Sequence, residues 1–126
     1  MNSGSLRARL RNLTGRAYRT VHPHEAVALL GEGAVLLDVR EAAEWAAGHA
    51  PQARHIPLDR LSARLHELPH GRPVVTVCRS GSRSARAAAL LAQSGHDVAD
   101  VAGGMLAWVR AGHGVVGKHG RPGRVA

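Results

Sequence analysis

Apolar and polar positions along the chain alternate between two patterns, and the first is a short, nearly continuous apolar run. Runs of this kind are typical of strands buried on both faces of a parallel sheet. They predict strands at 18–21, 34–39, 53–58, 73–78 and 97–102.

The segments between these runs have the spacing of helices. A proline at the first position and a glycine at the end delimit the segment 23–31. Leucines three and four residues apart form one apolar stripe over 58–68, which favours an amphipathic helix there. Further helices are expected at 41–48, 82–95 and 104–112, and Trp108 is expected to be buried on the last of them.

Strands that alternate with helices over one chain predict an α/β domain with a mainly parallel sheet. The length of 126 residues suits one such domain. Ligands of these sheets lie beyond the carboxyl ends of the strands. Three polar or nucleophilic residues occupy such ends, namely Asp38, Arg40 and Cys78.

The formal net charge is +8, and much of the excess lies near the two ends of the chain. Residues 1–17 and 116–126 are basic and lack apolar periodicity, so they are expected to be mobile arms around a domain at 18–115. The chain has two tryptophans, one tyrosine and no phenylalanine. Binding of single-stranded nucleic acid needs several aromatic side chains on one face, so this composition disfavours it.

Cysteine content restricts the chemistry and indicates the compartment. One cysteine excludes an internal disulfide framework and a four-cysteine metal site. We expect no cofactor and no metal. A lone thiol stays free in a reducing compartment, and no segment has the pattern of a signal peptide or a membrane span, so we expect a cytoplasmic protein.

The single thiol, Cys78, lies between an apolar strand and a polar loop that leads into a helix. Amide groups in a Gly/Ser loop before a helix can converge on an anion, and Gly81 permits the required backbone conformation. Thiol pKa values fall at helix N-termini and beside cations. Arg79 and Arg83 could supply positive charge or bind an oxyanion. The loop is therefore suited to activating a thiolate beside a small anion.

Three ordered motifs carry a resemblance to a known family. They are LLDVREAAEWAAGHAPQARHIP at 36–57, VVTVCRSGSRSARAAALLAQSG at 74–95 and DVADVAGGMLAWVRAGHGV at 97–115. Together they resemble the single-domain rhodanese sulfurtransferases over residues 18–112. The resemblance implies a rhodanese-like single domain with a mainly parallel five-stranded sheet and helices on both faces.

The resemblance also implies an enzyme of the thiosulfate sulfurtransferase type. Cys78 would take the outer sulfur of thiosulfate or a similar donor as a persulfide and pass it to cyanide, a thiol or a protein acceptor. Asp38 and Arg40 would support the loop by charge-assisted hydrogen bonds. The residues of the loop that would bind the donor are Arg79, Ser80, Gly81, Ser82 and Arg83.

Two other functions remain open from the sequence. Cysteine phosphatases and arsenate reductases on the related fold place five residues between the cysteine and the arginine of the loop. Only four separate Cys78 from Arg83, which disfavours that chemistry. A persulfide carrier or protein-interaction module would use the same loop and deliver sulfur to a partner protein. The sequence does not identify the physiological donor, the acceptor or the oligomeric state.

Overall fold

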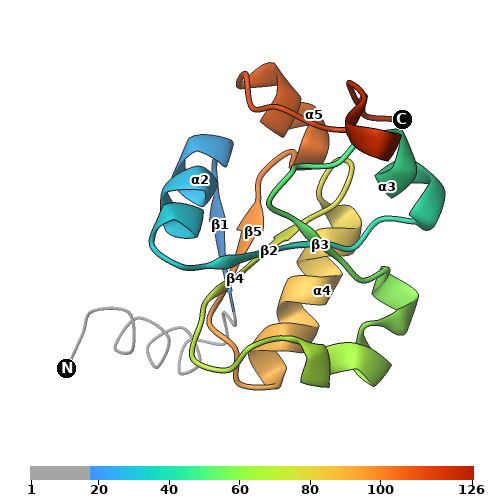
Figure 1. Cartoon of the computed structure of the whole chain (residues 1–126). Helices are drawn as coiled ribbons and strands as arrows, with labels where there is room; N and C mark the ends of the chain where they lie inside the picture. Colours follow the sequence, from blue (N-terminus) through green and yellow to red (C-terminus); the bar gives the residue numbers. More distant parts are fainter. Residues whose placement is uncertain (1–17) are drawn as a thin grey trace.

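A computed structural model describes residues 18–126, so the predicted N-terminal arm at 1–17 lies outside the described residues. Five parallel strands form one sheet in the order β1-β5-β4-β2-β3 (Figure 1). The strands are β1 (Arg19–Val21), β2 (Val35–Asp38), β3 (Arg54–His55), β4 (Val74–Val77) and β5 (Val98–Val101). The predicted α/β domain with a parallel five-stranded sheet is confirmed.

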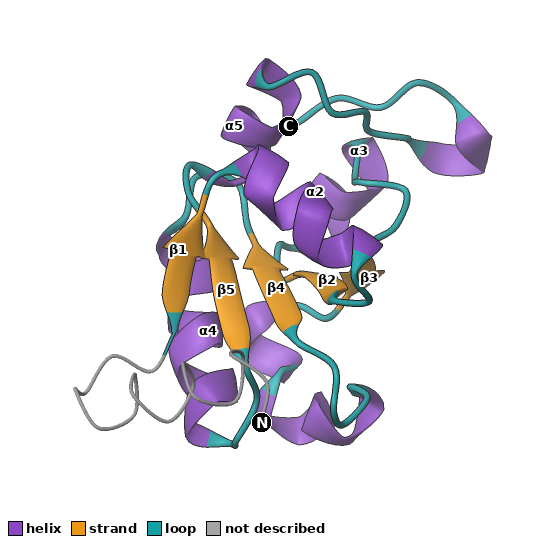
Figure 2. Ribbon diagram, turned by 90° about the vertical axis from the view of Figure 1, so that its left-hand side faces the viewer, coloured by secondary structure: helices purple, strands orange, loops and turns teal. Residues whose placement is uncertain are grey.

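Helices cover both faces of the sheet, and Figure 2 shows α2 and α4 on opposite sides of it. The helices are α2 (Pro23–Gly31), α3 (Ala42–Ala47), α4 (Ser82–Gln93) and α5 (Gly104–Arg110). None of the helices in residues 18–126 is long and apolar enough to cross a membrane.

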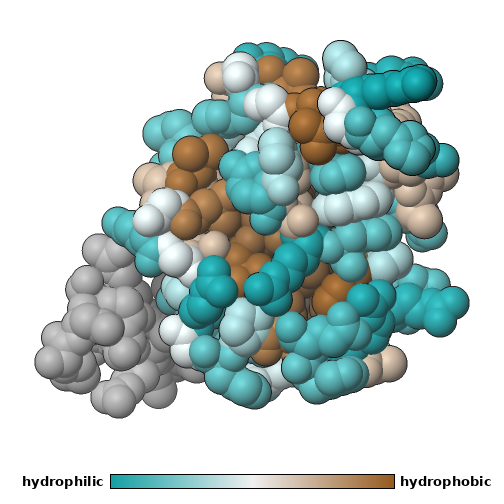
Figure 3. All heavy atoms as spheres, in the orientation of Figure 1, coloured by the Kyte–Doolittle hydropathy of each residue, from teal (hydrophilic) through white to brown (hydrophobic). Residues whose placement is uncertain are grey.

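Two apolar clusters, one for each face of the sheet, form the core. Every residue of β2, β4 and β5 is buried, as expected for strands with helices on both sides. Leu91 of α4 packs in one cluster with Cys78. Trp108 of α5 packs in the other and is 1% exposed, which confirms its predicted burial. The face drawn in Figure 3 is largely hydrophilic, with apolar side chains visible between the polar ones.

The prediction of one amphipathic helix over 58–68 is wrong. Two 3₁₀ segments occupy this region, η1 (Leu58–Arg60) and η2 (Ser62–Glu67). Their backbone bonds join residues three apart, as from the Leu61 amide to the Leu58 carbonyl. In a 3₁₀ turn, side chains three residues apart eclipse each other. The leucine stripe therefore still reaches the core, with Leu61 and Leu68 fully buried. The strand predicted at 53–58 is also shorter, because only Arg54–His55 pairs with β2.

The C-terminal segment 116–126 packs on the domain, unlike the mobile arm that the sequence suggested. Val116 forms two backbone hydrogen bonds with His49, of 2.8 and 3.0 Å. The Arg124 amide donates to the carbonyl of Ala47 at the end of α3. A Cβ atom on Gly48 would collide with the backbone of Arg124, so glycine allows this close approach. Figure 1 shows the C-terminus beside α3. Glycine-rich, charged composition did not prevent packing, because the backbone makes the hydrogen bonds and Val125 packs against the apolar cluster that contains Trp108.

Candidate active site

Cys78 directly follows β4, and its side chain is 1% exposed. The amide of Gly81 donates a hydrogen bond to Cys78 Sγ, with 3.1 Å between nitrogen and sulfur. Gly81 has φ of 127°, a conformation that residues with a Cβ atom rarely adopt. A donor at this distance stabilises negative charge on the sulfur. The loop thus directs a backbone dipole at the thiol, as its sequence predicts.

The start of α5 binds the other side of the same loop. The Met105 amide donates to the Cys78 carbonyl at 2.7 Å, and the Leu106 amide donates to the Arg79 carbonyl at 3.1 Å. A Cβ atom on Gly104 would collide with both carbonyls. The glycine pair before α5 therefore brings the helix close enough to fix the backbone at the thiol.

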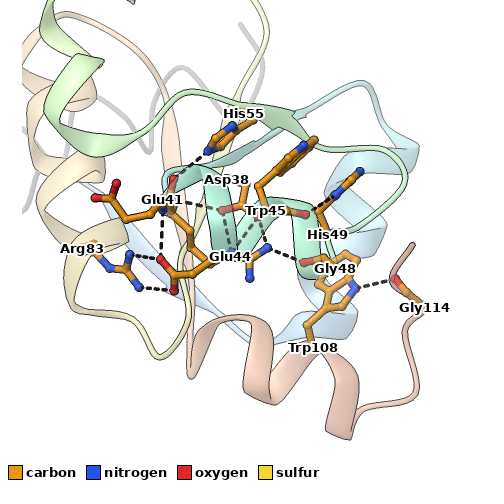
Figure 4. Close-up of polar contacts among 11 residues, drawn as sticks. Asp38, Glu41, Glu44, Trp45, Gly48, His49, His55, Arg83, Trp108 and Gly114 are labelled. Atoms are coloured by element: carbon orange, nitrogen blue, oxygen red, sulfur yellow. Dashed lines mark hydrogen bonds and ion pairs between the residues drawn. The ribbon is translucent and has the colours of Figure 1, made fainter. Parts of the chain in front are cut away.

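Arg83, the last residue of the loop, forms a two-pronged ion pair with Glu44 of α3. Its two terminal nitrogens lie 2.6 and 2.9 Å from the carboxylate oxygens. Figure 4 shows the two side chains facing each other. The Arg83 guanidinium holds the pKa of Glu44 at about 2. Arg83 is thus partly neutralised, which the sequence analysis did not anticipate.

The remaining loop side chains face outward. Arg79, Ser80 and Ser82 are exposed, and Ser82 begins α4. The Nε atom of Arg79 donates to the carbonyl of Ala126 at 2.9 Å. The C-terminal segment therefore contacts the loop as well as α3.

Asp38 and Arg40 form an ion pair that is fully buried at the end of β2. Arg40 donates from Nε and Nη2 to the Asp38 carboxylate, and from Nη2 to the Gly48 carbonyl at 2.7 Å. These bonds hold the end of α3, and α3 binds the Cys78 loop through Glu44. The predicted support of the loop by Asp38 and Arg40 thus has an indirect structural route.

Aromatic rings extend this support next to α3. Trp45 is partly buried and stacks on His49 and His55, with ring centroids 3.6 and 4.8 Å apart. His55 Nε2 lies 2.7 Å from the Arg40 carbonyl, and His49 Nδ1 lies 2.8 Å from the Trp45 carbonyl (Figure 4). Both histidines thus pack against Trp45 and hydrogen-bond to the backbone around α3.

Sequence reasoning missed several residues that hold the loop. In the sequence, Glu44 is recognisable only as the acidic residue before Trp45 in the first motif. Its ion-pair partner, Arg83, is 39 residues away, so no local pattern indicates the pair. Gly104 was visible as part of the Gly-Gly-x-x-x-Trp motif. Ala126 has no sequence signal, because its contact uses a backbone carbonyl.

Comparison with known proteins identifies the family. A model of the rhodanese-like domain matches residues 22–111. The chain belongs to the rhodanese-like domain family. A sulfurtransferase of Allochromatium vinosum is 41% identical over 90 residues, which are 71% of this chain and 84% of that protein.

Solved structures of rhodanese-type proteins share this fold. A rhodanese-related protein of Thermoplasma volcanium superposes with a TM-score of 0.73 at 30% identity, over 79% of this chain and 98% of that one. A thiosulfate sulfurtransferase of Pseudomonas aeruginosa superposes with a TM-score of 0.71 at 26% identity, over 98% of this chain and 23% of that one. This rhodanese-like chain is therefore a member of a sulfurtransferase family.

Proposed function

We propose that this rhodanese-like domain transfers sulfane sulfur from thiosulfate or a similar donor through a persulfide on Cys78. The contact between the Gly81 amide and Cys78 Sγ carries the proposal. This contact directs a backbone N–H group at the sulfur. The sulfur lies at the end of a parallel strand, where ligands of such sheets bind. The name of the Pseudomonas aeruginosa relative supports thiosulfate as the donor.

The reaction has two displacement steps at sulfur. The Cys78 thiolate attacks the outer sulfur of thiosulfate, a new S–S bond forms, and the S–S bond of the donor breaks with its electron pair leaving on sulfite. An acceptor such as cyanide or a thiol then attacks the outer sulfur of the persulfide. That S–S bond breaks, Cys78 leaves as thiolate, and the acceptor keeps the sulfur.

Backbone and side-chain groups of the loop have separate roles in this proposal. The Gly81 amide stabilises negative charge on Cys78 in both steps. Arg79 and Arg83 attract the anionic donor, and the exposed Ser80 and Ser82 offer hydroxyl groups to its oxyanion. Because Arg83 is shared with Glu44, its attraction for the donor is weaker than that of a free guanidinium.

A protein can also serve as the acceptor in this proposal. Arg79 is exposed beside the thiol, and the C-terminal segment adds exposed Lys118, Arg121 and Arg124 near α3. Such a basic surface favours an acidic partner. The proposed location is the cytoplasm, where a single thiol stays reduced.

Intact-mass measurement after mixing with thiosulfate tests the proposal. We expect the wild-type chain to gain one sulfur atom, and to lose it when cyanide is added, with thiocyanate as the product. The Cys78→Ser chain is the control and should gain nothing. A wild-type chain that gains no sulfur from thiosulfate, or gains it equally without Cys78, contradicts the proposed reaction.

A further inference from the structure

A buried polar cluster lies beneath the first turn of α4, next to the Cys78 loop. Its members are Thr76 of β4, Ser84 of α4 and Asp100 of β5, which are 0%, 0% and 5% exposed. Thr76 and Asp100 are register partners in the parallel ladder of β4 and β5. Thr76 Oγ1 lies 3.1 Å from Asp100 Oδ1. The proposed reaction uses none of these three side chains.

Gly81 joins this cluster to the thiol. Ser84 Oγ donates to the Gly81 carbonyl at 3.2 Å. The amide of the same glycine donates to Cys78 Sγ. A change of hydrogen bonding at the Gly81 carbonyl therefore acts on the residue that also binds the sulfur.

The hydroxyl protons in the cluster are fewer than the acceptors. Each hydroxyl donates one hydrogen bond. The Thr76 hydroxyl faces both Asp100 Oδ1 and the Ser84 carbonyl, at 3.1 and 3.2 Å. The Ser84 hydroxyl donates to the Gly81 carbonyl. The same side chain lies close enough to the Asp100 carboxyl group to lower the pKa of Asp100. Each hydroxyl can therefore donate its one proton either to the carboxyl group of Asp100 or to a backbone carbonyl.

The ionisation state of Asp100 determines which of these acceptors the two hydroxyls bind. As a carboxylate, Asp100 accepts only and draws both hydroxyl protons to itself. As a neutral acid, it donates a proton into the cluster and releases the hydroxyls toward the carbonyls of Ser84 and Gly81. Burial raises the pKa of Asp100, and hydrogen bonds from Ser84, Thr76 and the Val101 amide lower it in part. The neutral form thus persists to higher pH than for an exposed aspartate.

Few ionisable groups share this environment. On the same face of the sheet, β4 contributes Thr76 and Cys78, and β1 places Thr20 opposite Asp100. The buried face of α4 contributes Ser84 with apolar residues Ala87, Ala88 and Leu91. The titratable side chains on this face are Cys78 and Tyr18, which packs against the same apolar cluster from the position just before β1. The nearest charged residue of the loop, Arg83, is paired with Glu44.

We propose that Asp100 is a positioning residue for the Cys78 loop, acting through Ser84 on Gly81 and thereby on the reactivity of the sulfur. This inference rests on the proposed role of Cys78 as the nucleophile. Neutral Asp100 leaves the Ser84 hydroxyl on the Gly81 carbonyl and keeps the Gly81 amide directed at Sγ. Ionised Asp100 draws the Ser84 hydroxyl away from the Gly81 carbonyl, which loosens the loop at Gly81 and slows attack by the thiolate.

Alkylation of Cys78 by iodoacetamide as a function of pH tests this role in the full chain. Asp100→Asn keeps the shape and cannot ionise. At pH values above the pKa of Asp100, we expect this variant to react about twofold to tenfold faster than wild type, which is the effect of about one hydrogen bond. At pH values below that pKa, the two proteins should react equally fast. Asp59→Asn, an exposed change of the same kind, should react like wild type. Identical pH profiles for Asp100→Asn and wild type overturn the proposal.

Ser84→Ala shows whether the effect passes through the hydroxyl. In that background, Asp100→Asn should change the alkylation rate by less than twofold at every pH. An equal effect in both backgrounds would mean a charge acting through space, which overturns the route through Ser84. If Asp100→Asn does not fold, Ser84→Ala alone should lack the inflection seen in wild type, and its retention overturns the proposal. Alkylation needs no sulfur donor, so failure of persulfide formation would be seen separately.

Discussion

The ends of β2 and β4 lie side by side in the sheet, and each carries an arginine paired with a carboxylate, yet the two ends are built differently. Arg40 and Asp38 at the end of β2 are fully buried, and Arg40 donates from Nε and Nη2 to groups inside the protein, while its buried Nη1 has no hydrogen-bond partner among residues 18–126. Arg83 and Glu44 beyond β4 have side chains that are 30% and 19% exposed. The first pair fixes the backbone around α3, and the second leaves a guanidinium within reach of solvent at the thiol. Burial therefore separates the roles of two similar ion pairs: the buried pair stabilises the fold, and the partly exposed pair is accessible to a ligand.

Removal of the nucleophile should have the largest effect at the β4 end. Cys78→Ser should abolish persulfide formation and sulfur transfer to cyanide, because a hydroxyl is not ionised at neutral pH. The melting temperature should change by only a few degrees, because oxygen replaces sulfur in a site of the same shape. Intact mass, thiocyanate release and calorimetry measure the three quantities. Appreciable residual turnover would remove Cys78 from the mechanism.

Breaking the buried pair at the β2 end should cost the most stability. Arg40→Met leaves the Asp38 carboxylate buried and unpaired, so we expect the free energy of unfolding to fall by about 3–5 kcal/mol. Arg64→Met, at the exposed pair with Glu67, should cost much less stability, because water replaces the lost interaction. Urea unfolding of both variants makes the comparison. Similar losses would show that burial of the first pair has no structural importance.

Arg83 should affect binding of the donor more than turnover. Arg83→Ala should raise KM for thiosulfate by roughly 10- to 150-fold, as expected for one charge-assisted contact of about 1.5–3 kcal/mol. Glu44→Gln should instead lower KM, because it frees the guanidinium. Both effects should shrink at high ionic strength. If both variants raise KM alike, Arg83 serves only to anchor the loop to α3.

Acid should weaken the pair at the β4 end. Because the folded-state pKa of Glu44 is lowered to about 2 from its usual 4.5, its contribution is present above pH 4.5 and is lost as the pH falls toward 2. We expect a loss of about 1–2 kcal/mol, reduced by the partial exposure of the pair. Glu44→Gln should lack this part of the pH dependence in urea unfolding. A curve identical to that of wild type would contradict the ion pair in solution.

Removal of the C-terminal segment should have the smallest effect. A chain that ends at Val115 loses the backbone bonds of Val116 with His49 and of Arg124 with Ala47, together with the contact of Arg79 with Ala126 and the packing of Val125. Arg79, Arg124 and Ala126 are exposed, so water replaces much of what is lost. We expect unfolding to become easier by about 0.5–1.5 kcal/mol, with turnover on thiosulfate retained. Thermal unfolding and steady-state kinetics measure this. A collapse of turnover in a folded chain would place the segment in the active site.

Local sequence signals predicted the sheet and the thiol because each depends on neighbouring residues. The apolar run of β4 needs only its own composition to indicate burial on both faces. Cys78 was identifiable from its place between that run and a Gly/Ser loop. The type of the 58–68 turns was not predictable, because leucines three residues apart suit both an α-helix and a 3₁₀ turn.

Long-range contacts set the rest of the site, and the sequence alone contains no local record of them. The chain by itself determined five strands, three of which are buried throughout, a glycine at the position that requires φ of 127°, and a single thiol near it. Only the tertiary structure decided that Glu44 pairs with Arg83, and that Thr76 and Asp100 lie buried beside Ser84 behind the loop. The physical reason is that strand and turn preferences arise within a few residues, whereas the partner of a charge is chosen by how the elements pack.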